Sequence, residues 1–76
     1  MTNYQIIQDW RIRINGNEHG VPHVHVLFKD GSRASVAIET GEVLAGNVSA
    51  RRLAAAFANI EHNAAMYLAE YRRLNP

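Results

Sequence analysis

Residues 22–38, PHVHVLFKDGSRASVAI, contain two short runs of alternating apolar and polar side chains on either side of Asp30-Gly31. Alternation with a period of two is typical of a β-strand that has one buried and one solvated face. The Asp-Gly pair tolerates the positive φ angles of a tight hairpin turn. Pro22 suits the first position of a strand, where no backbone donor is needed. The stretch therefore predicts an antiparallel hairpin with strands at 23–29 and 33–38.

Two other segments extend this hairpin into a sheet. Residues 9–15 alternate in the same way, with Trp10, Ile12 and Ile14 on one side. Residues 42–45 form a short, fourth candidate strand after the turn at Thr40-Gly41. Because the connections are short, we expect an antiparallel meander.

The pattern changes to a helical period after Gly46-Asn47. Ser49 is a good N-cap residue, and no Gly or Pro interrupts residues 50–73. Apolar side chains recur there at helical spacing and form one stripe, made of Leu53, Phe57, Ile60, Ala64, Tyr67, Leu68 and Tyr71. The sequence predicts one long C-terminal helix, and Asn59 and Asn63 mark the place where a bend would be tolerated.

Together these elements predict a single α+β domain over residues 1–76, with a three- to four-stranded antiparallel meander and one long C-terminal helix packed on one face (β-β-β-(β)-α). Each layer needs the other to bury its apolar side. The sheet residues expected to face the helix are Trp10, Ile12, Ile14, Val24, Val26, Phe28, Val36 and Ile38.

The end of the predicted helix has two alternative environments. A straight helix over residues 50–73 would be about 36 Å long, which exceeds the width of a four-stranded sheet. Its last apolar residues, Tyr67, Leu68 and Tyr71, therefore either pack on Tyr4 and Ile6 or form an interface with a second copy or a partner.

Composition excludes several classes of protein. The chain has 76 residues, a formal net charge of +1 from eight Lys+Arg and seven Asp+Glu, and no cysteine. A uniformly basic nucleic-acid binder, a disulfide framework and a thiolate zinc site are therefore excluded, whereas a local basic patch is not. There is no apolar run of roughly 20 residues for a membrane span, and the first residues do not resemble a secretory signal. We expect a cytoplasmic protein with no membrane contact.

The sheet face opposite the helix is predicted to be open and mostly basic. It would present Arg11, Arg13, His23, His25, Lys29, Arg33, Ser35 and Glu39. One interpretation is an ordinary solvated or binding face, since antiparallel sheets commonly expose one side. The concentration of His19, His23 and His25 within seven residues suggests two chemical alternatives.

His23 and His25 are two residues apart, so they lie on the same side of a strand, about 6.6 Å apart along it. The two imidazoles could bind one divalent transition metal such as zinc, with His19 or Glu39 as a further ligand. They could instead act without a metal as general base and general acid on a phosphodiester. In that case Arg11 and Arg13 would stabilise the developing charge.

Residues 18–26, EHGVPHVHV, resemble the hallmark of a family of small bacterial proteins of unknown function, with the pattern D/E-H-x-P-P-H-x-H-V. Glu18, His19, Pro22, His23 and His25 match that pattern, whereas Val21 replaces its first proline. The resemblance extends over nearly the whole chain. Members of that family are often encoded beside another small protein, and the resemblance implies a toxin–antitoxin-like pair.

We therefore expect a small cytoplasmic protein of a toxin–antitoxin-like pair, which binds RNA or a cognate protein through its open His- and Arg-bearing face. The alternative is an enzyme, either a histidine-dependent ribonuclease or a metal-dependent hydrolase that uses His19, His23 and His25.

Overall fold

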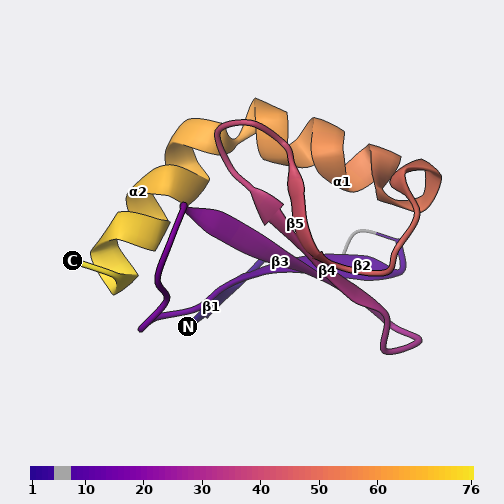
Figure 1. The fold of residues 1–76 in the computed structure, drawn as a ribbon, viewed down its shortest axis with the longest axis horizontal. Helices are drawn as coiled ribbons and strands as arrows, with labels where there is room; N and C mark the ends of the chain where they lie inside the picture. The colour runs from indigo at the N-terminus through magenta and orange to yellow at the C-terminus, as the bar shows by residue number, and fades with distance from the viewer. Residues whose placement is uncertain (5–7) are drawn as a thin grey trace.

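A computed structural model describes residues 1–4 and 8–76. In this part of the chain, a five-stranded antiparallel sheet precedes two helices (Figure 1). The strands are β1 (Thr2–Asn3), β2 (Trp10–Ile14), β3 (His23–Phe28), β4 (Arg33–Ala37) and β5 (Val43–Gly46). The helices are α1 (Ala50–His62) and α2 (Ala64–Leu74). Strands adjacent in sequence are adjacent in the sheet, so the α+β class and the predicted meander are confirmed.

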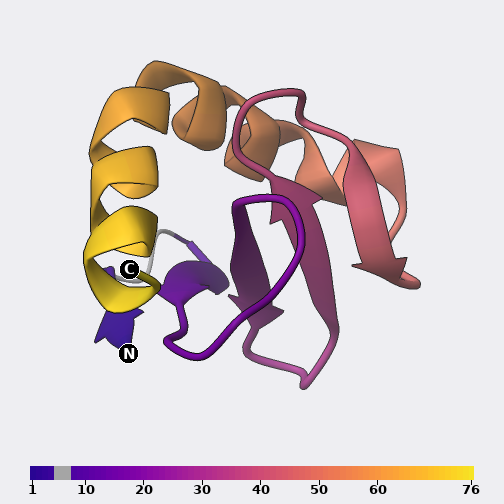
Figure 2. The same ribbon diagram turned by 60° about the vertical axis from the view of Figure 1, so that its left-hand side comes forward.

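The strand register places apolar residues opposite apolar residues. Ile12 pairs with Val26, and Val24 pairs with Val36, across neighbouring strands. All eight sheet residues predicted to face the helix are buried, and Ala34 joins them. Leu53, Ala56 and Ile60 of α1 close the core from the helical layer. Figure 2 shows α1 lying across the sheet while α2 descends beside it.

The sheet has more strands than the three or four that were predicted. β1 is a two-residue strand that pairs with β2, Thr2 opposite Ile14 and Asn3 opposite Arg13. Two residues are too few to show an alternating pattern, so this strand could not be predicted from periodicity. β5 pairs with β4 as the fourth candidate strand, with a register irregularity between Ser35 and Val36.

The prediction of one long helix is wrong, because the helix divides at Asn63. Asn63 has a non-helical φ of −111°, and both its backbone N–H and its side-chain Nδ2 donate to the carbonyl oxygen of Asn59, each at 3.0 Å. The Tyr67 hydroxyl donates to Asn59 Oδ1 at 2.5 Å across the bend. An asparagine side chain that competes for backbone acceptors in this way disfavours a continuous helix. The break falls at the end of the Asn59–Asn63 stretch where a bend was anticipated.

The bend brings the last helical residues onto their own chain. Tyr67 and Tyr71 are buried, and the Tyr67 ring packs edge-to-face on Tyr4 with ring centroids 4.9 Å apart. Of the two alternatives, packing on Tyr4 is observed for Tyr67, whereas Ile6 lies outside the described residues. Two of the three residues considered for a homodimer interface are thus covered within one chain. Neither described helix is long and apolar enough to cross a bilayer.

Arg52 connects the start of α1 to the sheet through ion pairs and a cation–π contact. The Ser49 hydroxyl accepts from the Arg52 N–H at 3.2 Å, which confirms the predicted N-cap. The Arg52 guanidinium donates to Asp30 at 3.0 Å and to Asp9 at 3.4 Å, and it stacks 4.1 Å above the centre of the Phe28 ring. The positive charge of Arg52 is therefore neutralised inside the chain.

Gly46 allows β5 to approach β4 closely. Its φ is +105°, and a Cβ at this position would lie 2.4 Å from the Arg33 carbonyl oxygen and 2.7 Å from the Ala34 Cα. We predict that Gly46→Ala destabilises the protein by at least about 2 kcal/mol, because strain at positive φ adds to a clash with backbone that cannot move aside. Urea unfolding provides the measurement.

Gly41→Ala is the matched control for Gly46→Ala. Gly41 also has positive φ, +76°, but a Cβ there would meet nothing within 4 Å. We expect it to cost only about 1 kcal/mol, the backbone strain alone. Equal losses for the two variants would contradict a role for the close approach.

Glu70 links α2 to β1 and predicts a pH dependence of stability. Hydrogen bonds from Arg73 and then from Thr2 lower the pKa of Glu70 from 4.5 to about 2. A carboxyl group whose pKa is lower in the folded state stabilises the protein above its unfolded pKa, and this contribution is lost as pH falls through the folded pKa. The stabilisation by Glu70 is therefore complete above about pH 4.5 and disappears towards pH 2.

We predict that Glu70→Gln lowers Tm most near neutral pH, and that the difference from wild type shrinks as the pH falls from 4.5 to 2. Thermal unfolding followed by circular dichroism across this range measures the effect. Glu61→Gln, at an exposed position on α1, is the control. A difference between Glu70→Gln and wild type that does not vary with pH would show that the linkage is wrong.

Candidate functional site

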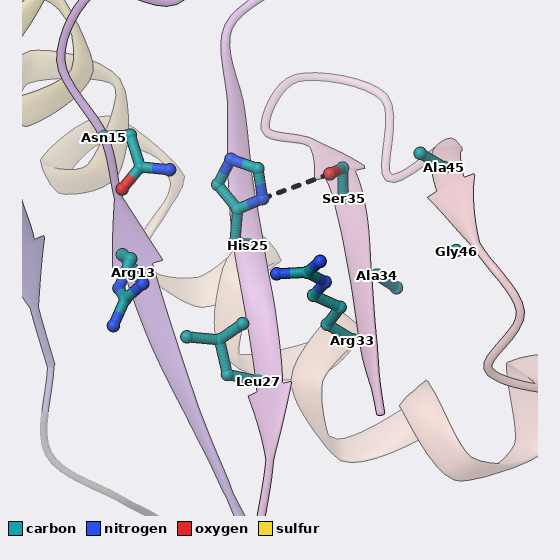
Figure 3. Close-up of a pocket in the computed structure, with 9 residues that line it drawn as sticks. All are labelled: Arg13, Asn15, His25, Leu27, Arg33, Ala34, Ser35, Ala45 and Gly46. Atoms are coloured by element: carbon teal, nitrogen blue, oxygen red, sulfur yellow. Dashed lines mark hydrogen bonds between the residues drawn. The ribbon is translucent and has the colours of Figure 1, made fainter. Parts of the chain in front are cut away.

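The strand register that aligns the core residues also aligns a row of polar residues on the opposite face of the sheet. Arg13 of β2 pairs with His25 of β3, and His25 pairs with Ser35 of β4. The side chains of this row flank a cavity of about 240 Å³ (Figure 3). The helices lie behind the sheet in this view, so the cavity is on the face that they leave open.

The cavity is open on its β5 side because the residues there have small side chains or none. Ala45 and Gly46 line that side, and the longer side chains of Arg13, Arg33 and Leu27 line the rest with Asn15, His25 and Ser35. Among the described residues, neither Arg13 nor Arg33 forms an ion pair, in contrast to Arg52 and Arg73. The cavity lining therefore carries two guanidinium charges that have no ion-pair partner among the described residues, on a chain with a formal net charge of +1.

His25 is held at both ring nitrogens. Its Nδ1 lies 3.2 Å from Ser35 Oγ, and its Nε2 lies 3.1 Å from Glu18 Oε1. The ring is half-buried and lines the cavity. The two contacts fix the plane of the imidazole, so its position relative to the arginines is set before any ligand arrives.

His23 lies on the same side of β3 as His25 but is buried, with an exposed fraction of 9%. Its ring centroid is 5.1 Å from that of His25 and 5.7 Å from that of Tyr71 on α2. The expectation that His23 faces open solvent is therefore wrong, because the bend at Asn63 carries Tyr71 to the start of β3. His23 does not line the cavity between the arginines.

Glu18 joins the two histidines from the loop that precedes β3. Its Oε1 is 3.1 Å from His25 Nε2, and its Oε2 is 3.8 Å from His23 Nε2. The hydrogen bond from His25 is the largest cause that lowers the pKa of Glu18 below its usual range, and a hydrogen bond from Asn15 acts in the same direction. Glu18 is therefore a carboxylate at neutral pH, with one oxygen directed to each ring.

Asn75 holds this loop in place from the end of α2. Its Oδ1 accepts from the Glu18 backbone N–H at 2.7 Å, and its Nδ2 donates to the carbonyl oxygens of Asn15 and Tyr71, both at 2.9 Å. A single side chain thus connects the helix terminus to both ends of the segment that positions Glu18.

Three residues predicted for the site lie apart from it. His19 is exposed in the loop and is not in the group of close ligand atoms formed by Glu18, His23 and His25. Glu39 is also outside that group, because β4 ends at Ala37 and Glu39 lies in the following turn, where it lines a different hollow with Phe57 and Glu61. Arg11 is half-buried opposite Leu27 and does not line the cavity.

Two residues that position the site, Glu18 and Asn75, were not predicted to do so, although Glu18 matches the family pattern. Glu18 could have been found from its place in the EHGVPHVH stretch, five and seven residues before the histidines that it contacts. Asn75 gave no such signal, because its two partners in the loop, Glu18 and Asn15, are 57 and 60 residues away in the sequence.

Residues 9–72 match the family model described as a domain of unknown function, DUF4160. The chain belongs to this family. The matched region contains the cavity and the Glu18, His23 and His25 group, and it ends before Asn75. No curated protein and no solved structure matches the chain. The predicted membership of a family of unknown function is therefore confirmed, whereas the D/E-H-x-P-P-H-x-H-V hallmark and the toxin–antitoxin context stay predictions.

We predict that Asn75→Ala loosens the Glu18 loop of this DUF4160 protein. The change removes three hydrogen bonds, which should cost about 1–3 kcal/mol of folding stability. The Glu18 amide should exchange faster with solvent, and the imidazole signals of His25 should shift. Amide exchange and NMR spectra of the histidines measure both effects. Asn47→Ala, at an exposed position before α1, is the control, and an unchanged Glu18 amide would contradict the positioning role of Asn75.

Proposed function

We propose that this DUF4160 protein binds single-stranded RNA through the open face of its sheet, with phosphate groups held between Arg13 and Arg33. The observation that carries the proposal is that Arg13 and Arg33 line one cavity and neither pairs with a carboxylate among the described residues. Arg13 Nε donates to the neutral amide oxygen Oδ1 of Asn3 at 3.1 Å, so its charge is not neutralised by this contact. Guanidinium groups bind phosphate oxygens through paired N–H donors.

The distribution of charge supports an anionic ligand at this cavity. Arg52 and Arg73 pair with acidic residues of their own chain. The cavity lining contains two arginines, a histidine and no carboxylate. Binding to phosphates there would release counterions from RNA, a term that contributes most of non-specific affinity.

The open sheet face also suits single-stranded rather than double-stranded RNA. Leu27 gives the cavity an apolar wall, and the planar groups of Arg13, Arg33 and His25 are surfaces on which unpaired bases can stack. A cognate protein is the alternative ligand that the sequence predicts. An acidic protein surface would need to insert carboxylates into a cavity of about 240 Å³, whereas a flexible strand can follow it. Membership of a toxin–antitoxin-like pair is retained as a prediction.

A second candidate function is cleavage of the RNA, and the contacts of His25 favour it. Glu18 orients the His25 ring from one nitrogen, and the ring lines the cavity where the arginines would hold a phosphate. A ring so oriented can act as a general base, and the arginines can stabilise charge on the phosphorus oxygens. His23 lies outside the cavity, so the predicted pairing of two imidazoles as base and acid is not supported by its position.

The test is binding of a labelled ten-nucleotide RNA, followed by fluorescence anisotropy at several salt concentrations. We expect Arg13→Gln and Arg33→Gln each to weaken binding about five- to tenfold at low salt. The double variant should reduce the dependence of log Kd on log salt by about 1.4, or about 0.7 for each phosphate contact on a single strand.

Arg72→Gln is the control for these variants, because Arg72 is exposed on α2 away from the cavity. Wild-type affinity in the double variant would refute the proposed function. The same RNA, analysed on a gel after incubation, tests the second candidate. Cleavage by wild type that His25→Gln abolishes without loss of binding would support an enzyme, whereas intact RNA would rule cleavage out.

A further inference from the structure

Glu18, His23 and His25 place three ligand atoms within 4.8 Å of one another. In a tetrahedral zinc site with bonds of about 2.0–2.1 Å, ligand atoms lie about 3.3 Å apart. The distances from the Glu18 oxygens to the two Nε2 atoms are 3.1 Å for His25 and 3.8 Å for His23, and they lie on either side of that value. The two contacts use different oxygens of the carboxylate, and no two of the three ligand atoms are more than 4.8 Å apart, so each pair would close by about 1.5 Å at most to reach coordination distance.

The other nitrogen of each ring is already engaged, which leaves Nε2 as the available ligand. His23 Nδ1 lies 2.9 Å from the carbonyl oxygen of Val21. A carbonyl can only accept, so Nδ1 carries the proton and neutral His23 presents an Nε2 lone pair. Histidines that bind metal are usually held in this way, by donating their second ring N–H to a carbonyl or a carboxylate.

Ser35 can hold the Nδ1 of His25 in the way that the Val21 carbonyl holds the Nδ1 of His23. Its hydroxyl is 3.2 Å from Nδ1 and can either donate to the ring or accept from it. In the metal-free protein, His25 Nε2–H donates to Glu18 while the Ser35 hydroxyl donates to Nδ1. With a cation on Nε2, the proton moves to Nδ1 and Ser35 becomes the acceptor. The hydrogen bond at Ser35 is therefore kept in both states.

From these contacts we propose that Glu18, His23 and His25 form a binding site for one divalent transition-metal ion, with Zn²⁺ as the best match. Two imidazoles and one carboxylate are typical zinc ligands, and three protein ligands leave a coordination position for water or a phosphate oxygen. This ligand set replaces the one predicted from the sequence, because His19 and Glu39 are not part of the group. The proposal goes beyond RNA binding and does not depend on it.

The three side chains are partly buried, which suits an ion that is held by the protein and is still accessible from solvent. Their side chains are 28% exposed for Glu18, 11% for His23 and 22% for His25. Tyr71 covers His23, and Asn75 holds the Glu18 loop, so the ligands are fixed by contacts outside the group. A preorganised group of this kind loses little conformational freedom when the ion binds.

The experiment is a titration of the full chain with ZnCl₂ alone, followed by NMR of the imidazole signals and by calorimetry. We expect saturable binding of one ion, with the signals of His23 and His25 shifting together while those of His19 and His62 stay in place. Co²⁺ should give the visible absorption bands of a low-coordinate site. Zinc should raise Tm, because the ion binds only the folded state.

Glu18→Gln and His25→Gln remove ligands without emptying the core, and each should weaken zinc binding by at least about tenfold. His19→Ala and Glu39→Gln are the matched controls and should bind zinc like wild type. A circular dichroism spectrum like that of the wild type shows that each variant is folded. Absence of saturable binding at about 1 mM zinc, or weakening by His19→Ala equal to that by Glu18→Gln, would overturn the proposal. RNA binding measured in the presence of a chelator tests the proposed function separately.

Discussion

β3 pairs with β2 and β4 in a register that determines both faces of the sheet at once. Val24 and Val26 lie opposite Val36 and Ile12, and these residues are sealed under the helices. The alternate positions then align Arg13, His25 and Ser35 on the other face. A shift of one residue would turn valines to solvent and histidines into the core, so hydrophobic burial fixes the arrangement of the polar row.

The bend at Asn63 adds the second determinant of the site. A straight helix would have continued past the sheet, whereas the division into α1 and α2 lets the chain fold back beside it (Figure 1). Tyr71 then covers His23, and Asn75 reaches the loop that carries Glu18. The group of Glu18, His23 and His25 is consequently assembled from a loop, a strand and the support of a helix end.

Features of the fold that depend on neighbouring residues could be predicted from the sequence, whereas features that depend on residues far away in the sequence could not. Local periodicity was enough for the core residues of β2, β3 and β4, for the turn at Asp30-Gly31 and for the N-cap Ser49, because neighbouring residues determine them. The burial of His23 was not predictable, since it depends on the path that α2 takes after Asn63. It was equally unpredictable that Glu18, and not its neighbour His19, would lie beside His23 and His25. The conformation of their loop depends on the hydrogen bond from the Glu18 backbone to Asn75, which is 57 residues away from Glu18 in the sequence. β1 was missed because two residues carry no period.

The way β5 ends the sheet has a consequence for how the protein behaves at high concentration. β5 is an edge strand with exposed Val43 and Leu44, and its register against β4 is irregular between Ser35 and Val36. Its last residue, Gly46, has a backbone conformation that a regular strand does not adopt. A kinked edge offers a poor template for a strand from another molecule. The irregular pairing that brings Gly46 close to β4 thus also disfavours the addition of further strands to this edge. This holds even though the side chains of Val43 and Leu44 at the same edge are exposed.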